Sequence, residues 1–466
     1  MKFSVCRGFT VDCSKLYGIP WGVQAADMEE KRETFQKAVD ALASIRQKGI
    51  SPGEETPVLF PHLPYLLEEK KLISEEEIQH MDELAQFSHE KVDALISVGI
   101  GGSYLGNQVL FDVACGPYWN MESGEERRHW PLCFFAGQTA DPEALAGLLA
   151  HLRREAGKKE NFTVLVLVIS KSGTTIEPSG ALSVLARELP AFCNPRFAAV
   201  SDAKKGRLLA LCKEKGWMHF AVPEGIGGRF SVFSQVGLIF ASLLGLDIRQ
   251  FLAGARAVEE ACQSSDWHEN PALALAGMKH IATRKYGIQA EVTMPYADRL
   301  RSLAWWYAQL LGESLGKKKN IHGEIVNAGR IPVSAVGSTD MHSLTQEQQE
   351  GKRNKLLQFI GVEQPAADLD FELEEGGKPC VVPMSKVIAA ALRSNEESLA
   401  NEERMSCRLS IKAIDLFHVG ALMYFFFLTI AYEGAMADID AYDQPGVEGY
   451  KKILHKDLAE YGKNKG

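Results

Sequence analysis

Short runs of aliphatic and β-branched residues alternate along the chain with longer stretches in which apolar residues recur at helical spacing. After residue 90 the short runs lie at 94–98, 132–135, 163–169, 197–200 and 218–222. This alternation predicts an α/β fold in which helices cover both faces of a mainly parallel sheet. Such sheets bind ligands at the carboxyl ends of their strands, where helix N-termini present free N–H groups.

The second half of the chain shows the same pattern more loosely. It predicts strands at 289–294, 331–336, 369–373 and 409–411, and helices at 299–311, 342–350, 384–400 and 416–435. The first 90 residues are expected to be mainly helical, with one helix at 75–89 after Ser74 as N-cap. We therefore divide the chain into a helical segment (1–90) that packs on two α/β domains (91–265 and 266–466).

Composition restricts the class of protein. Hydrophobic residues make up 46% and charged residues 24%, as in an ordinary globular protein, and the net charge of −9 argues against nucleic acid or an anionic membrane as partner. The apolar stretch 420–432 is shorter than the roughly 20 residues of a membrane span, which predicts a buried helix. The nine cysteines form no C-x-x-C pair, and the N-terminus carries no export signal. These features predict reduced thiols and a cytoplasmic location.

Two loops are candidates for binding phosphate. In loop 99–103 (GIGGS), Gly102 and Ser103 follow a strand and precede a helix, which fits either an anion site or a tight turn without ligand. Loop 170–175 (SKSGTT) offers Ser170, Lys171 and other donors at a helix N-terminus without a competing carboxylate. We favour phosphate for this loop over a simple capping role, which needs one hydroxyl only. Neither loop matches a dinucleotide or P-loop motif.

A carboxylate near the end of an apolar helix is the candidate base. The segment 309–317 (QLLGESLGK) carries Glu313, and isomerisation of an aldose to a ketose needs one base that moves a proton between neighbouring carbons. Taken alone, this segment is better explained by a solvated glutamate at a helix end. Arg229, in the turn 225–231 (GIGGRFS), offers either a cation for a developing enediolate or a structural salt bridge.

Two further residues are candidates for proton transfer during opening of a cyclic sugar. His342 lies in the segment 337–342 (GSTDMH), and Lys451 follows the segment 443–448 (DQPGVE). Either one, taken alone, is usually a structural or solvated side chain, and only the two together indicate proton transfer. The lysines at 317–319 are expected to form a solvated loop, and no histidine spacing indicates a metal site.

In this order the motifs resemble the phosphoglucose isomerase family. The matches extend from loop 99–103 to Lys451 and include G-G-R-F-S, Q-x-x-x-E-S-x-G-K and D-Q-P-G-V-E-x-x-K. The resemblance implies two domains of the sugar-isomerase (SIS) type, each a three-layer αβα sandwich. It also implies reversible isomerisation of glucose 6-phosphate and fructose 6-phosphate through a cis-enediol(ate), in glycolysis and gluconeogenesis, without cofactor or metal.

The resemblance also implies a role for each matching residue. Glu313 would move the proton between C2 and C1, Arg229 would stabilise the intermediate, and Glu177 would orient His342. His342 and Lys451 would assist ring opening, with Lys452 as a competitor for the lysine role. The residues expected to bind the substrate are Gly102, Ser103, Ser170, Lys171, Ser172, Thr175, Gln309 and Gln444.

The family is typically a homodimer in which the histidine reaches the other subunit's active site, so we expect a dimer and a poorly active monomer. Met341 stands where the family usually has glutamine, and the stretch 317–329 is unusual in composition. These departures affect one hydrogen bond and one loop, not the chemistry. Two alternatives remain open: an isomerase that also accepts mannose 6-phosphate, and a sugar-phosphate sensor without catalytic activity.

Overall fold

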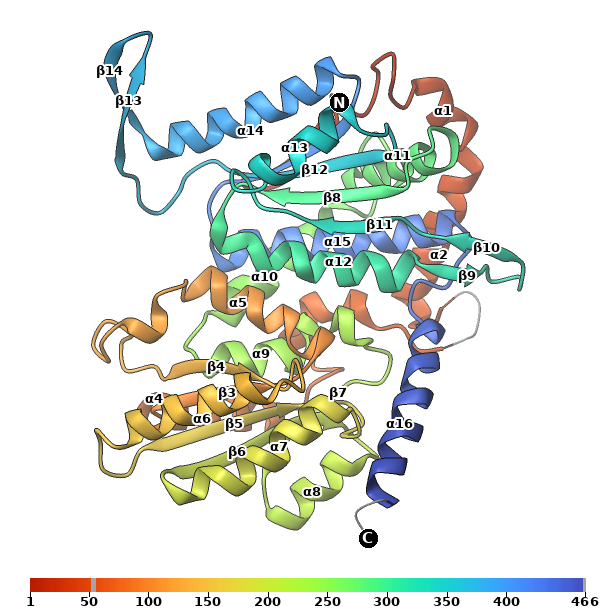
Figure 1. Cartoon of the computed structure of the whole chain (residues 1–466). Helices are drawn as coiled ribbons and strands as arrows, with labels where there is room; N and C mark the ends of the chain where they lie inside the picture. The colour runs from red at the N-terminus through yellow and green to blue at the C-terminus, as the bar shows by residue number, and fades with distance from the viewer. Residues whose placement is uncertain (52–55, 464–466) are drawn as a thin grey trace.

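The chain forms two α/β units stacked on each other, with the first sheet in the lower half of Figure 1 and the second sheet in the upper half. The computed structural model describes residues 1–51 and 56–463. Helices lie on both faces of each sheet, as the alternating pattern predicts, and both sheets are mainly parallel. The predicted fold class is therefore confirmed.

The first sheet consists of five parallel strands in the order β4-β3-β5-β6-β7. Their bounds are β3 Ala94–Val98, β4 Leu132–Ala136, β5 Thr163–Ile169, β6 Asn194–Asp202 and β7 Met218–Val222. All five were predicted, although β6 begins earlier and ends later than its apolar run. β5 is buried along its whole length at the centre of the sheet, which explains why it is continuously apolar.

Six helices accompany this sheet. Their bounds are α4 Glu75–Lys91, α5 Leu105–Ala114, α6 Pro142–Ala156, α7 Ile176–Glu188, α8 Arg207–Lys215 and α9 Gln235–Ser242. In Figure 1, α5 and α9 lie between the two sheets, and α7 and α8 lie on the outer face. The predicted cap of α4 is present, since Ser74 Oγ accepts a hydrogen bond from the N–H of Glu77 at 3.0 Å.

The second sheet has six strands in the order β1-β2-β15-β12-β8-β11. Their bounds are β1 Lys2–Cys6, β2 Phe9–Asp12, β8 Ala290–Pro295, β11 Ile331–Ser334, β12 Lys355–Val362 and β15 Met405–Ile411. The last four are parallel to their neighbours, whereas β2 is antiparallel to β15 and β1 is antiparallel to β2. The strands β1, β2 and β12 were not predicted, although helices do dominate the first 90 residues as expected.

The predicted strand at 369–373 is not part of the second sheet. It corresponds to β13 (Asp370–Glu375), which pairs with β14 (Lys378–Pro383) in a separate two-stranded sheet. The two strands form an arm that projects from the upper unit in Figure 1. Gly376 and Gly377 both have positive φ angles, and this two-residue glycine turn favours a local hairpin over a long-range pairing.

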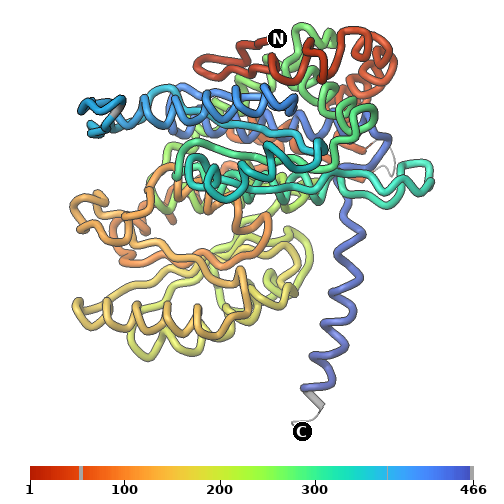
Figure 2. Tube along the Cα trace, turned by 45° about the horizontal axis from the view of Figure 1, so that its top comes forward, coloured from red at the N-terminus to blue at the C-terminus, as the bar shows by residue number. Residues whose placement is uncertain are grey.

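Most of the remaining helices pack around the second sheet. Their bounds are α1 Ala25–Glu30, α2 Arg32–Lys48, α3 Leu66–Glu69, α10 Ile248–Ala261, α11 Pro271–Lys285, α12 Arg301–Leu315, α13 Met341–Glu350, α14 Met384–Asn401, α15 Leu416–Met436 and α16 Glu448–Lys463. A short hairpin, β9 (Lys317–Lys319) with β10 (Ile325–Ala328), follows α12. Figure 2 shows α16 standing apart from the rest of the chain.

The predicted buried helix is α15. Within the described residues it is the one helix that is long and apolar enough to cross a membrane, and 89% of its most apolar 18-residue window is buried inside the protein. It packs along α10, which the sequence places in the first domain. The division at residues 90 and 265 thus remains a proposal, since α10 and the strands β1 and β2 all contact the second unit.

A buried network of charges fixes α12 in the second unit. Lys279 Nζ lies 2.6 Å from Glu291 Oε1, and Arg330 Nη2 lies 2.7 Å from Glu291 Oε2. Tyr307 on α12 donates to Glu291 at 2.8 Å, and Arg330 also pairs with Glu433 on α15 at 2.9 Å. Burial raises the pKa of Glu291, but the two cations outweigh burial and bring it from 4.5 to about 2. The network therefore joins α11, β8, α12 and α15.

We expect Glu291→Gln to lower the free energy of unfolding at pH 7 by about 3 to 5 kcal/mol, because it leaves the buried Lys279 without its carboxylate partner and removes one of the two carboxylates paired with Arg330. Since the folded-state pKa is depressed, the contribution is complete above pH 4.5 and is lost as the pH falls toward about 2. Urea denaturation at pH 7 and pH 3 measures both effects, and the difference from wild type shrinks at pH 3. The control is Glu347→Gln, which breaks an exposed pair with Lys355 and should cost less than about 1 kcal/mol. Equal losses in the two variants would contradict the prediction.

Candidate active site

A cavity of about 600 Å³ lies between the carboxyl ends of the first sheet and the C-terminal half of α12. It brings together residues that are far apart in the sequence. The predicted residues that line it are Gly102, Ser103, Ser170, Lys171, Ser172, Thr175, Gln309, Glu313 and Gln444. All predicted substrate-binding residues thus surround one space, and their contacts with substrate stay a prediction.

Loop 170–175 is shaped to present donors to the cavity. Gly173 has a φ of +69°, and a Cβ there would lie 2.4 Å from the backbone nitrogen of Leu208, so the loop needs glycine at this point. Ser170 Oγ accepts a hydrogen bond from the N–H of Gly173 at 3.1 Å. Thr175 is the N-cap of α7, but its side chain makes no capping hydrogen bond. The hydroxyls of Ser172 and Thr174 bond each other at 2.8 Å and help to shape the loop. The N-terminus of α7 has no side-chain cap, so its N–H groups are available to an anion.

The two glycine-rich turns of the first half of the chain contact each other. A Cβ on Gly102 would lie 2.0 Å from the carbonyl oxygen of Gly228, and a Cβ on Gly101 would lie 2.9 Å from Gln309 Nε2. Side chains at these two positions would push the turns apart and displace Gln309. The glycines therefore let Ser103, Gln309 and the turn that carries Arg229 meet at one place.

Glu313 lies in the last turn of α12 and borders the cavity. Its Oε1 accepts a hydrogen bond from Gln309 Nε2 at 3.1 Å, and its Oε2 lies 3.5 Å from Arg229 Nη1. The side chain is 28% exposed. It is therefore not a freely solvated glutamate, because a rigid helix holds it beside a buried cation.

Arg229 is a fully buried cation that ties three segments together. Its nitrogens donate four hydrogen bonds: Nε to Ser314 Oγ at 2.7 Å, Nη1 to Gln444 Oε1 at 2.9 Å, and Nη2 to the carbonyl oxygens of Ala441 at 2.5 Å and Asp443 at 3.0 Å. Burial lowers the pKa of Arg229, whereas the carboxylate of Glu313 opposes that shift. The guanidinium keeps its charge at working pH. The arginine holds the site together and places positive charge beside Glu313. Its stabilisation of an enediolate stays a prediction.

Lys317 was expected in a solvated loop, and that expectation is wrong. Its side chain is only 5% exposed, and Nζ donates to the carbonyl oxygens of Glu313 at 2.8 Å and Asp443 at 2.6 Å. Burial lowers the pKa of Lys317, and the bond to Asp443 opposes this shift. Lys318 and Lys319 are exposed as expected. A run of three lysines gives no sign of which one is buried, and only its place after E-S-x-G sets Lys317 apart.

His342, Glu177 and Lys451 do not reach this cavity within one chain. His342 is exposed on α13, Glu177 is half-buried on α7, and Lys451 on α16 pairs with Glu448 at 2.9 Å. None of the three lines the cavity. Within residues 1–51 and 56–463, no hydrogen bond or ion pair joins Glu177 to His342. The expected positioning of His342 by Glu177 is thus not formed inside a single chain.

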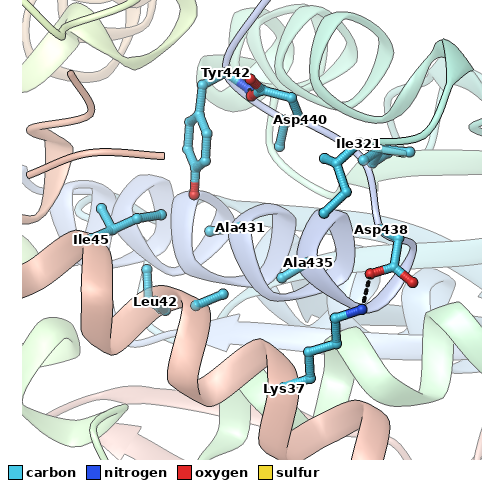
Figure 3. Close-up of a pocket in the computed structure, with 12 residues that line it drawn as sticks. Lys37, Leu42, Ile45, Ile321, Ala431, Ala435, Asp438, Asp440 and Tyr442 are labelled. Carbon is cyan, nitrogen blue, oxygen red and sulfur yellow. Dashed lines mark hydrogen bonds and ion pairs between the residues drawn. The ribbon is translucent and has the colours of Figure 1, made fainter. Parts of the chain in front are cut away.

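A second, smaller pocket of about 50 Å³ lies between α2 and α15, on the segment that leads to Gln444 (Figure 3). Its wall is mainly aliphatic, and the ion pair of Lys37 with Asp438 lies at its edge. It lacks convergent donors for an anion. The phosphate is therefore expected in the larger cavity and not here.

The larger cavity combines two kinds of chemistry. One side offers hydroxyls, a lysine and a helix N-terminus to an anion, and the other offers Glu313 beside a buried guanidinium. In the described part of the chain, no group of three or more His, Cys, Asp or Glu side chains is placed to hold a metal ion. The arrangement suits proton transfer within an anionic substrate.

Comparisons with known proteins agree with this geometry. The family model described as phosphoglucose isomerase matches residues 69–373. The glucose-6-phosphate isomerase of Carboxydothermus hydrogenoformans is 37% identical over 453 residues, which cover 94% of this chain and 91% of that protein. The enzyme of the same name from Streptococcus thermophilus is 34% identical, with coverage of 92% and 93%.

Solved structures show the same fold. The crystal structure of a glucose-6-phosphate isomerase from Chlamydia trachomatis superposes with a TM-score of 0.80 at 22% identity and covers 98% of this chain and 89% of that chain. A hypothetical protein from Thermus thermophilus superposes with a TM-score of 0.78 at 26% identity, with coverage of 97% and 100%. The similarity therefore extends over both units of the chain.

Proposed function

Since the chain belongs to the phosphoglucose isomerase family, it is an isomerase of glucose 6-phosphate and fructose 6-phosphate, and we propose which residues carry out that reaction. The observation that supports the proposal best is the cavity itself. It places the donors of loop 170–175 and the carboxylate of Glu313 around one space, although they come from different units. A sugar phosphate needs both: a fixed anchor at its phosphate and a base at the carbons that react.

In the proposed reaction, Ser103, Ser170, Ser172 and Thr175 hold the phosphate with Lys171, and Gln309 and Gln444 contact the sugar. Glu313 removes the proton from C2 of the open aldose, and the electrons move toward the carbonyl oxygen at C1. A proton passes from the C2 hydroxyl to the oxygen at C1, and Glu313 returns its proton to C1 as the C2 carbonyl forms. The enediolate formed between these steps carries the charge that Arg229 stabilises. One carboxylate thereby serves both proton transfers.

Ring opening must precede this step, and we propose that His342 and Lys451 assist it. Neither residue lines the cavity of its own chain, and His342 is exposed on α13. We therefore propose a homodimer in which His342 of one subunit completes the site of the other and meets Glu177 there. This part of the proposal explains why Glu177 and His342 have no contact within one chain.

The helix α16 supports a dimer independently. None of its described side chains is buried, yet it exposes a row of large apolar residues. These are Tyr450, Ile453, Leu458 and Tyr461. An amphipathic helix that stands apart from its own chain is expected to bury its apolar face on a partner, and a second copy is the partner we propose.

We also propose that the protein acts in the cytoplasm. All nine cysteines are free thiols in the structure, and most of them are buried or half-buried. A reducing compartment keeps such thiols free.

A coupled assay tests the function directly. Purified protein is supplied with fructose 6-phosphate, and formation of glucose 6-phosphate is followed through a dehydrogenase specific for that product. Turnover excludes the sugar-phosphate sensor, whereas tight binding without turnover would support it. Mannose 6-phosphate in a parallel reaction shows whether the enzyme also accepts the other configuration at C2.

Subunit complementation tests the shared site. Glu313→Gln and His342→Gln are each expected to be nearly inactive as homodimers. A heterodimer of the two, purified through two different affinity tags, contains one site with both residues intact, so we expect about half of the wild-type activity. The matched control is the heterodimer of Glu313→Gln with Glu313→Gln/His342→Gln, in which no site has both residues. If the first heterodimer is as inactive as its parents, His342 acts within its own chain and the proposed arrangement is wrong.

A further inference from the structure

The segment 202–206, which joins β6 to α8, lines the same cavity as the predicted phosphate loop. It contributes Asp202, Lys205 and Gly206 to the wall. No motif in the sequence pointed to this segment. It is therefore a part of the cavity wall without an assigned role.

Backbone contacts join this segment to loop 170–175. The N–H of Asp202 donates to the carbonyl oxygen of Lys171 at 3.0 Å, and the N–H of Arg207 donates to that of Ser172 at 3.1 Å. Gly206 has a φ of +113°, and a Cβ there would lie 2.8 Å from the oxygen of Ser172. The two segments are thus fixed to each other, and a side chain on one has a defined position relative to the other.

The turn is built around the carboxylate of Asp202. Its Oδ1 accepts hydrogen bonds from the N–H groups of Lys204 at 2.8 Å and Lys205 at 3.0 Å. The first of these bonds contributes most to lowering the pKa of Asp202, and the charges of Lys171 and Lys205 lower it further. Asp202, Lys171 and Lys205 all line the same cavity.

The two adjacent lysines of the turn differ in their surroundings. Lys204 Nζ pairs with Glu224 at 3.0 Å on the surface and does not line the cavity. Lys205 lines the cavity, and no ion pair to it is found among the residues the structure describes. One lysine is thus neutralised at the surface, and its neighbour keeps its charge at the cavity.

We propose that Lys205 is a second cationic ligand of the substrate's phosphate, in addition to Lys171; this inference rests on the proposed function. A phosphate monoester carries a charge of about −1.5 to −2 at neutral pH. Lys171 supplies one positive charge and the N-terminus of α7 about half of one, while Asp202 subtracts one. Lys205 restores the balance and favours a doubly charged phosphate over a neutral or singly charged group.

The test compares Lys205→Met with the matched control Lys204→Met. Binding of inorganic phosphate is measured by titration calorimetry, and the kinetics of fructose 6-phosphate are measured at several salt concentrations. We expect Lys205→Met to weaken phosphate binding and to raise KM by about tenfold, with the effect falling on KM rather than kcat. The dependence of kcat/KM on salt should also become weaker than in wild type. Lys204→Met should change none of these values, and Lys205→Arg should restore most of the phosphate affinity.

The inference is overturned if Lys205→Met binds inorganic phosphate as tightly as wild type, or if Lys204→Met loses as much affinity. Circular dichroism and thermal unfolding show that each variant is folded. A different measurement would contradict the proposed function, namely the absence of turnover of fructose 6-phosphate by wild-type protein. The calorimetric comparison with inorganic phosphate still reports on Lys205 in that case.

Discussion

Glu313→Gln is expected to lower kcat for fructose 6-phosphate by about 10³-fold, because the amide cannot accept the proton that the carboxylate moves between the two carbons. The substitution keeps the size of the side chain. It also leaves the neighbouring residues Gln309 and Arg229 unchanged. The coupled assay measures the loss. Incubation in deuterated water provides a second measurement, since wild type should exchange a proton at C1 of fructose 6-phosphate with solvent and the variant should not.

The controls separate chemistry from binding. Inorganic phosphate should bind Glu313→Gln as it binds wild type, because Glu313 lies on the side of the cavity away from loop 170–175. Glu324→Gln, which changes an exposed glutamate in the loop between β9 and β10, should keep wild-type kcat. A kcat for Glu313→Gln within tenfold of wild type would show that another group is the base.

Arg229→Gln is expected to lower kcat by about 10² to 10³-fold, the usual loss when a donor to a developing negative charge is removed. The guanidinium lies 3.5 Å from Glu313 and donates to Gln444, so its loss affects both the enediolate and the residues around it. We expect a smaller change in KM, because the phosphate loop does not depend on this arginine. Steady-state kinetics in both reaction directions show how the loss divides between kcat and KM.

A folding defect is the competing explanation for Arg229→Gln, because the variant leaves the carbonyl groups of Ala441 and Asp443 without their donor. Arg229→Lys restores the charge without the four-bond geometry. If the loss of kcat in Arg229→Gln is due to the missing positive charge, Arg229→Lys should recover part of kcat. If neither variant binds inorganic phosphate or unfolds cooperatively, the arginine is structural and its proposed role in the reaction fails.

Local patterns were sufficient for most of the fold. The five strands of the first sheet are short apolar runs, most of which end next to glycine or serine, and they form where the pattern placed them. The strands that the sequence pattern did not predict were missed because they form through long-range pairing. β2 pairs with β15, about 400 residues later, and no local signal reports such a pairing, while β1 joins the sheet only through β2. The strand at 369–373 was assigned to the wrong sheet because periodicity predicts a strand but not its partner.

For the cavity, motifs identified the residues but not their surroundings. Glu313, Gln309 and the donors of loop 170–175 carry recognisable local sequence, and all of them line one space. Lys317 was misjudged, since its burial depends on the segment after α15 folding over it. Lys205 was overlooked, because only the contact between two loops places it at the cavity and leaves Lys204 outside.

The sequence by itself therefore determined the class of fold, the family and the residue types available for chemistry, because hydrophobic periodicity and loop composition are local properties. The tertiary structure decided which of these residues meet. Contacts between distant segments bring Gly102 close to Gly228 and bury Arg229 and Lys317. They also keep His342 out of its own chain's cavity. Long-range packing sets these contacts, and the free energy of a local segment carries no information about them.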